Sequence, residues 1–178
     1  GIISLPGDKS ISHRALMLAA LTNGECCLYN LSTGEDVEST RICLLKCGIK
    51  SKKESDHLLI MGGNLTNPLS PIDCGNSGTS VRLLSGLLLG QGINVQLIGD
   101  KSLSSRPMRR IIAPLQEMGG NISANNDKLP IVISKSELNA ISYKMPIASA
   151  QVKSAIIFAA LGSKNPVEII EPIQSRDH

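Results

Sequence analysis

Two cations and a hydroxyl stand at the start of an expected helix near the beginning of the chain. Lys9, Ser10 and Arg14 follow a Pro-Gly break at positions 6 and 7 and flank the start of an apolar run at 15–21. We predict a helix over residues 10–21 whose first turns present these side chains beside free backbone N–H groups. Cations at this end oppose the helix dipole and cost about 0.3–1 kcal/mol each unless an anion offsets them. The pattern predicts a phosphate or carboxylate site; the alternative is that Lys9 and Arg14 point into water.

This arrangement recurs along the sequence. Segments 10–21, 77–88 and 149–161 each open with serine, carry a cation about one turn later and then run apolar. The three cations are Arg14, Arg82 and Lys153, which are 68 and 71 residues apart. A second helix is predicted 22 to 24 residues after each cation, near Asp36, Arg106 and Arg176. We interpret the chain as a threefold repeat whose helix N-termini converge on one anion-binding face. Because the third unit would stop soon after its second helix begins, we expect the chain to be a piece of a longer protein.

Helical and strand-like segments alternate throughout, which predicts a mixed α/β fold. Helical periodicity fits residues 10–21, 37–47, 77–89, 107–118 and 150–161. Apolar strand-like runs bounded by Gly, Pro, Asn or Ser occupy residues 26–31, 57–61, 93–98, 129–133, 141–145 and 167–170. Gly48 and Gly119 follow two of the helices, where a left-handed cap is expected.

Composition excludes several classes of protein. A net charge of +3 over 178 residues suits small anions better than a polyanion, and one Phe, two Tyr and no Trp leave few stacking platforms for nucleic acid. The apolar runs are shorter than the roughly 20 residues of a membrane span. Five cysteines, an odd number without paired metal-ligand spacing, are interpreted as reduced core residues. We expect a cytoplasmic protein that binds neither nucleic acid nor membrane.

Five motifs resemble an ordered set found in one enzyme family. They are PGDKSISHRA (6–15), GNSGTSVRLLSGLL (75–88), GDKSLSSRPM (99–108), ASAQVKSA (148–155) and SRDH (175–178). Together they resemble the 5-enolpyruvylshikimate-3-phosphate (EPSP) synthase family, also called 3-phosphoshikimate 1-carboxyvinyltransferase. The resemblance implies an α/β fold of the inside-out barrel type, with two lobes of three βαβαββ units each. On this basis residues 1–7 are a crossover from the other lobe, and 8–178 form an N-terminal lobe of units at about 8–68, 69–140 and 141–178. The third unit is incomplete, and the C-terminal lobe is missing.

The resemblance also implies a reaction. The enolpyruvyl group of phosphoenolpyruvate is transferred to the 5-hydroxyl of shikimate 3-phosphate, releasing phosphate, in the biosynthesis of chorismate and the aromatic amino acids. No metal or organic cofactor is implied. The family's acid and base residues lie in the missing lobe, so we expect this chain alone to be inactive.

Site residues carry over to positions that match the motifs. Lys9 is the expected catalytic residue and contacts both substrates. The residues expected at shikimate 3-phosphate are Lys9, Ser10, Arg14, Ser149, Ala150, Gln151 and Arg176. Those expected at phosphoenolpyruvate are Lys9, Asn76, Gly78, Thr79, Arg106 and Gln151. Arg82 and Lys153 stay open between ligand contact and a bracing role. His13 is expected to be a surface or bracing residue rather than a general base, and Asp100 and Lys101 to shape the turn before Arg106.

Three other functions compete with this interpretation. The sister enolpyruvyl transferase acting on UDP-N-acetylglucosamine has the same fold. An RNA-binding repeat module would also carry cations at its helix ends, and a non-catalytic scaffold would need no acid or base. The occurrence of Lys9, Asn76, Arg106 and Gln151 in one ordered set favours the EPSP synthase family.

Overall fold

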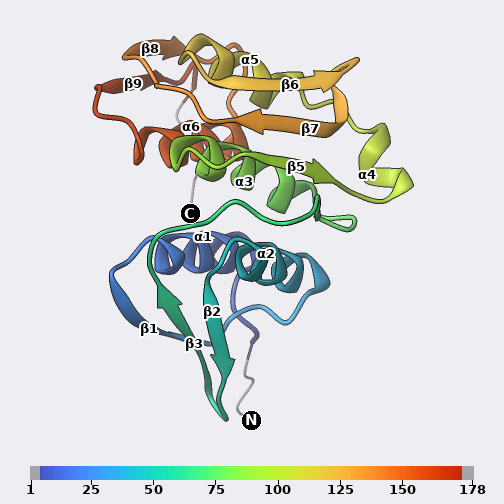
Figure 1. The fold of residues 1–178 in the computed structure, drawn as a ribbon, viewed down its shortest axis with the longest axis vertical. Helices are drawn as coiled ribbons and strands as arrows, with labels where there is room; N and C mark the ends of the chain where they lie inside the picture. The colour runs from blue at the N-terminus through green and yellow to red at the C-terminus, as the bar shows by residue number, and fades with distance from the viewer. Residues whose placement is uncertain (1–4, 174–178) are drawn as a thin grey trace.

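The computed structural model describes residues 5–173 (Figure 1). Its elements in chain order are α1 (Lys9–Ala20), β1 (Gly24–Tyr29), α2 (Glu35–Lys46), β2 (Lys50–Lys53), β3 (His57–Gly62), β4 (Ile72–Asp73), α3 (Gly78–Gly90), β5 (Val95–Ile98), α4 (Lys101–Ser105), α5 (Arg109–Glu117), β6 (Asn121–Asn125), β7 (Lys128–Ser134), β8 (Ile141–Lys144), α6 (Ala150–Ala160) and β9 (Val167–Ile170). The mixed α/β fold predicted from the sequence is confirmed.

Each sheet draws its strands from one section of the chain. The first has the order β1-β3-β2 and is antiparallel, and the second has the order β4-β5-β7-β6 with only β4 and β5 parallel. The parallel pair β8-β9 forms the third. Figure 1 shows α1 and α2 between the first sheet and the remaining helices. The unit boundaries near residues 68 and 140 stay a prediction.

Helix α3 is the centre of the core. Its apolar sequence is buried on nearly every side, and it packs against α1, α2, α5 and α6. Gly86 and Gly90 bring it against α6 so closely that a Cβ at either position would collide with the backbone oxygen of Ala155 or Ala159. Because both contact positions advance along both chains together, α3 and α6 are parallel. Their N-termini therefore lie at the same end of the molecule.

The predicted elements are present, with shifted ends and four additions. All five helices and six strands are found, and Gly48 and Gly119 adopt the predicted left-handed conformation, with φ of +90° and +85°. Elements β2, β4, β6 and α4 are not predicted by the sequence pattern. Strand β2 has no apolar residue, and β6 is a mostly polar edge strand with only two apolar residues, whereas β4 and α4 have only two and five residues. The helix expected from residue 107 starts at Arg109, so Arg106 ends α4 rather than opening α5.

Other expectations have mixed outcomes. All five cysteines are free, but only Cys43, Cys47 and Cys74 are buried, and Cys27 is exposed, so the expectation that all five are core residues was wrong.

Residues 5–8 form neither helix nor strand, and residues 1–4 of the expected crossover lie outside the described part. The second helix expected near Arg176 lies outside it as well. Among residues 5–173, no helix is long and apolar enough to span a bilayer, and no group of His, Cys, Asp or Glu could hold a metal ion.

Candidate active site

The N-termini of α1, α3 and α6 are each capped by a side chain. Asp8 Oδ1 accepts the N–H of Ile11 at 2.8 Å, and the hydroxyls of Ser77 and Ser149 accept N–H groups in the first turns of α3 and α6 at 3.2 and 3.4 Å. Such caps satisfy only part of the first turn, and the remaining N–H groups still favour an anion. The recurring serine-and-cation pattern of the sequence therefore corresponds to three real helix starts.

Hydrogen bonds across the helices hold these starts together. Gln151 Nε2 donates to Thr79 Oγ1 at 3.0 Å, joining the first turns of α6 and α3. Arg14 Nε donates to Ser154 Oγ at 3.0 Å, joining α1 and α6 one turn further in. The predicted convergence of the three helix N-termini is thus present in the fold.

Arg14 also folds back over the start of its own helix. Its Nη1 donates to the carbonyl oxygen of Ser10 at 2.9 Å. Partial burial is the main cause that lowers the pKa of Arg14, and Asp8 acts in the opposite direction. Ser10 and Arg14 therefore form one cationic corner at the start of α1.

Lys9 is paired with an acidic residue that the sequence analysis did not assign to the site. Its Nζ lies 2.9 Å from Asp36 Oδ2 in the first turn of α2, and the two side chains are 54% and 33% exposed. An ion pair this exposed is weak and is screened by solvent, so Lys9 can exchange its partner for an anionic ligand. The acidic first turn of α2, which also contains Glu35 and Glu38, is the feature of the sequence that could have indicated Asp36 as a partner of Lys9.

Asn76 joins Arg106 to Asp100. Its amide nitrogen donates to Asp100 Oδ2, and its amide oxygen accepts from Arg106 Nη2, both at 2.6 Å. Asp100 also caps α4 by accepting the N–H of Leu103, and this bond, followed by the one from Asn76, lowers the pKa of the Asp100 carboxyl. The expectation that Asp100 shapes the turn before Arg106 is confirmed.

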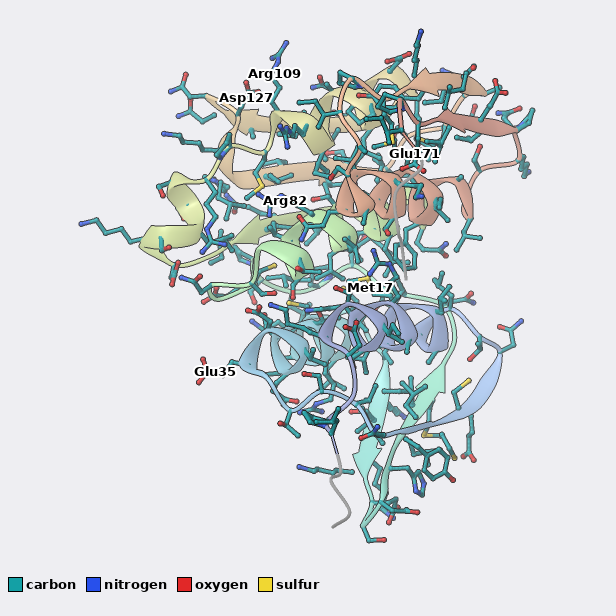
Figure 2. The ribbon with its side chains drawn as sticks, turned by 180° about the vertical axis from the view of Figure 1, so that it is seen from behind. Met17, Glu35, Arg82, Arg109, Asp127 and Glu171 are labelled. Carbon is teal, nitrogen blue, oxygen red and sulfur yellow. The ribbon has the colours of Figure 1, made fainter. Side chains whose placement is uncertain are left out.

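Two guanidinium groups meet beside Gly78. A Cβ at Gly78 would lie 2.7 Å from Arg82 Nη1 and 3.1 Å from Arg106 Nη1. Arg82 donates to the carbonyl oxygen of Gly78 at 3.2 Å, and Figure 2 shows it on the side of α3 away from α1 and Met17. Burial is the main cause that lowers the pKa of Arg82, and the charges of Arg106 and Arg110 lower it further. In residues 5–173 no carboxylate pairs with Arg82 or Arg106 within 4.0 Å, which leaves a concentration of positive charge there.

The remaining candidates are three residues at the start of α6, together with Lys153 and Arg176. Ser149, Ala150 and Gln151 form the start of α6, beside the start of α3. Lys153 is held by Glu171 at 2.9 Å, with both side chains mostly buried, and Figure 2 shows Glu171 next to α6. Arg176 lies outside the described residues.

His13 is buried, which excludes the surface position that was one of its two expected roles. Its side chain has no exposed surface, and its Nδ1 lies 2.7 Å from the hydroxyl of Thr40. Burial is the main cause that lowers the pKa of His13 to about 4. A neutral imidazole without solvent contact cannot serve as the general base of a surface site, so only the bracing role remains.

Cations beside helix N-termini at one end of an α/β fold are the chemistry expected of a site for small anions. Comparison with known proteins shows the family. The family model for EPSP synthase (3-phosphoshikimate 1-carboxyvinyltransferase) matches residues 1–178, and the chain belongs to this family.

The similarity extends over the whole chain. The 3-phosphoshikimate 1-carboxyvinyltransferases of Streptococcus uberis and Thermotoga neapolitana are each 46% identical to it, over 184 and 179 residues. The structure of EPSP synthase from Acinetobacter baumannii superposes with a TM-score of 0.94 at 39% identity. In each comparison all of this chain is covered, but it spans only 42–43% of the length of the relative.

Proposed function

We propose that this chain supplies one half of the active site of a 3-phosphoshikimate 1-carboxyvinyltransferase. In that reaction the enolpyruvyl group of phosphoenolpyruvate passes to the 5-hydroxyl of shikimate 3-phosphate, and phosphate is released. The observation that carries the proposal is the linkage of Asn76, Thr79, Arg106 and Gln151, which come from three separate motifs, around the close approach at Gly78. Family membership favours this reaction over that of the UDP-N-acetylglucosamine enzyme, an RNA module or a scaffold.

The phosphoenolpyruvate half of the proposed site surrounds Gly78. Arg106 binds the phosphate of phosphoenolpyruvate, and the absence of a side chain at Gly78 lets the ligand approach the first turn of α3. Asn76 holds Arg106 through its amide oxygen, and Thr79 and Gln151 complete the wall toward α6. Two guanidinium groups with no carboxylate within 4.0 Å among residues 5–173 favour a phosphate, because its oxygens carry the opposite charge and can accept paired N–H···O bonds from an arginine.

The shikimate 3-phosphate half lies between α1 and α6. The start of α6 binds the 3-phosphate through the Ser149 hydroxyl, the Ala150 N–H and the Gln151 amide. Ser10 and Arg14 hold the hydroxyls and carboxylate of the shikimate ring. Lys9 contacts both substrates after exchanging Asp36 for them. Arg176 adds a further cation in this proposal.

The proposal extends to the organisation of the whole enzyme. Residues 1–7 would be a crossover, and the lobe would consist of units at about 8–68, 69–140 and 141–178. A C-terminal lobe would close over the helix N-termini and bring the acid and base. Five free cysteines fit a reducing compartment, so we place the enzyme in the cytoplasm.

A titration of the isotope-labelled chain with shikimate 3-phosphate, followed by amide NMR, tests the proposal. We expect saturable shifts in residues 10–14 and 149–151, with shifts in 76–79 when phosphoenolpyruvate is added. A Lys9→Ala, Arg106→Ala double variant should lose both responses while keeping its dispersed spectrum. Shifts that are absent, or that survive in the double variant, would refute the assigned site in this half.

A further inference from the structure

A chain of hydrogen-bonded polar side chains connects α1, α2 and α3 inside the protein. His13 Nδ1 lies 2.7 Å from Thr40 Oγ1, Thr40 Oγ1 lies 2.7 Å from Ser80 Oγ, and Ser80 Oγ lies 2.7 Å from Ser77 Oγ. All four residues are buried, with at most 1% of their surface exposed. These side chains therefore have no direct contact with a ligand at the surface.

The direction of the hydrogen bonds follows from the acceptors. Ser80 Oγ has one proton and also lies 3.1 Å from the carbonyl oxygen of Asp36, which can only accept. The single proton of Ser80 Oγ is shared between Ser77 Oγ, 2.7 Å away, and this carbonyl oxygen, so Ser80 accepts from Thr40. Thr40 has then used its proton, so it accepts from His13 Nδ1–H. His13 Nε2 is left as an unprotonated acceptor, which agrees with its lack of a partner among the described residues.

The members of this network stand within about one helical turn of residues at the proposed site. His13 follows Lys9 by four residues, and Thr40 follows Asp36 by four residues. Ser80 follows Thr79 directly, and Ser77 is both a network member and the N-cap of α3. One turn of helix is about 5.4 Å long, so the network crosses the three helices just beneath the face that carries the site.

We propose that His13, Thr40, Ser80 and Ser77 form a positioning network that sets Lys9 on α1 relative to residues 76–79 on α3, with α2 as the connecting element. The inference rests on the proposed function for what the two groups bind. Apolar contacts alone would hold these helices together, but directional hydrogen bonds between buried groups select one arrangement among similar packings. The network matters for the reaction because Lys9 must reach both substrates, and misplacement by about 1 Å can cost up to a hundredfold in rate.

A set of three variants isolates the positioning role. Thr40→Val removes the hydroxyl at the centre of the network and keeps the side-chain shape. Thr40→Ser keeps the hydroxyl. Ser85→Ala is the matched control, because Ser85 is also fully buried on α3, but its hydroxyl donates only to Val81 of the same helix, at 2.7 Å.

Residual dipolar couplings of the amides measure the orientation of α1 relative to α3 in the 178-residue chain without ligand. Thr40→Val should change this orientation beyond the experimental error and raise the dissociation constant for shikimate 3-phosphate about tenfold, whereas Thr40→Ser restores both values. Ser85→Ala should lower the urea midpoint without changing either value. If Thr40→Val does not fold, Ser80→Ala tests the inference in its place. It is a smaller truncation, and the same changes in helix orientation and in the dissociation constant are expected.

An unchanged helix orientation in a folded Thr40→Val chain would overturn the inference, and so would an equal reorientation in Ser85→Ala. A different result would refute the proposed function. If the wild-type chain does not bind shikimate 3-phosphate at all, the substrate assignment is refuted for this half, while the dipolar couplings still decide whether the network positions the helices.

Discussion

Gly78 is the residue beside which the guanidinium groups of Arg82 and Arg106 meet. An added methyl group would lie 2.7 Å from Arg82 Nη1 and 3.1 Å from Arg106 Nη1. Because both are ends of flexible side chains, Gly78→Ala should displace the guanidinium groups without unfolding the chain. We expect the dissociation constant for phosphoenolpyruvate to rise about tenfold, equivalent to about 1.4 kcal/mol, in a titration followed by amide NMR.

Gly34→Ala provides the control for this substitution. At Gly34 the nearest atom to an added Cβ is 3.7 Å away, which is ordinary van der Waals contact. Binding should be unaffected by Gly34→Ala. If Gly78→Ala binds phosphoenolpyruvate as well as the wild type does, the arginine pair does not form the phosphate site.

His13 makes the stability of the fold depend on pH. Burial is the main cause that lowers its pKa from 6.5 to about 4; Asp36 raises it, and Lys9 and Arg14 lower it further. The unfolded chain thus binds a proton at His13 at a higher pH than the folded chain does. The contribution of His13 is fully present above pH 6.5, and it is lost progressively as the pH falls toward 4.

We therefore expect the urea midpoint of the wild-type chain to fall between pH 7 and pH 5. The midpoint of His13→Asn, which has no titrating group at this position, should fall less over the same interval. The imidazole of His13 itself should show no protonation shift by NMR above pH 5. A wild type and variant with parallel pH profiles would show that His13 is not held neutral.

At the scale of elements, the parallel contact of α3 with α6 sets the relative position of Thr79 and Gln151. Gly86→Ala would place a methyl group against the backbone oxygen of Ala155, which cannot move as a side chain can. Overpacking of this kind typically costs about 1–3 kcal/mol and sometimes more. We expect a lower free energy of unfolding in urea and, in the folded fraction, altered amide shifts at Thr79 and Gln151, because separating the helices stretches the bond between them.

Gly63→Ala separates this effect from the general cost of replacing a glycine. No atom lies within 4 Å of a Cβ added at Gly63. The variant should unfold at nearly the wild-type urea concentration. A Gly86→Ala chain as stable as Gly63→Ala would mean that α3 and α6 have room to move apart.

The sequence predicted the helices well because their apolar periodicity is strong, and it predicted strands only where they are apolar. Strand β2, with the sequence KSKK, has no apolar residue. It forms because it pairs with β3, which follows it in the sequence. Helix α4 depends on its Asp100 cap and on contacts with β7 rather than on periodicity. Elements held by tertiary contacts were therefore the ones missed.

Candidate site residues were predictable from motifs, but their partners were not. Asn76 and Arg106 are 30 residues apart and Thr79 and Gln151 are 72 apart, so only the fold shows that they touch. The burial of His13 did leave a signal, since residues 13, 16, 17 and 20 share one face of α1 and are all buried. A polar residue on the apolar face of a helix indicates a buried hydrogen bond rather than a surface position.

At the scale of the whole molecule, the N-termini of α1, α3 and α6 lie together at one end of the fold. Hydrogen bonds between α1 and α6, between α3 and α6, and through Thr40 between α1 and α3 tie the N-termini into one face. The face is rich in donors and cations. Carboxylates near the proposed ligands are engaged: Asp8 by the N–H of Ile11, Asp36 by Lys9, and Asp100 by Asn76 and the start of α4.

The two proposed ligands are phosphorylated carboxylates, but enolpyruvyl transfer also needs groups that add and remove protons. His13 is buried away from the face formed by the helix N-termini, Asp8 and Asp100 accept hydrogen bonds at helix caps, and Asp36 is paired with Lys9. We expect the 178-residue chain to release no phosphate above background from shikimate 3-phosphate and phosphoenolpyruvate, although it binds the former. A coupled phosphate assay at saturating substrate measures this, with the Lys9→Ala chain as the blank. Phosphate release by the wild-type chain that the Lys9→Ala variant lacks would show that this half of the fold contains a complete catalytic site, and the acid and base would then have to be sought among its own residues.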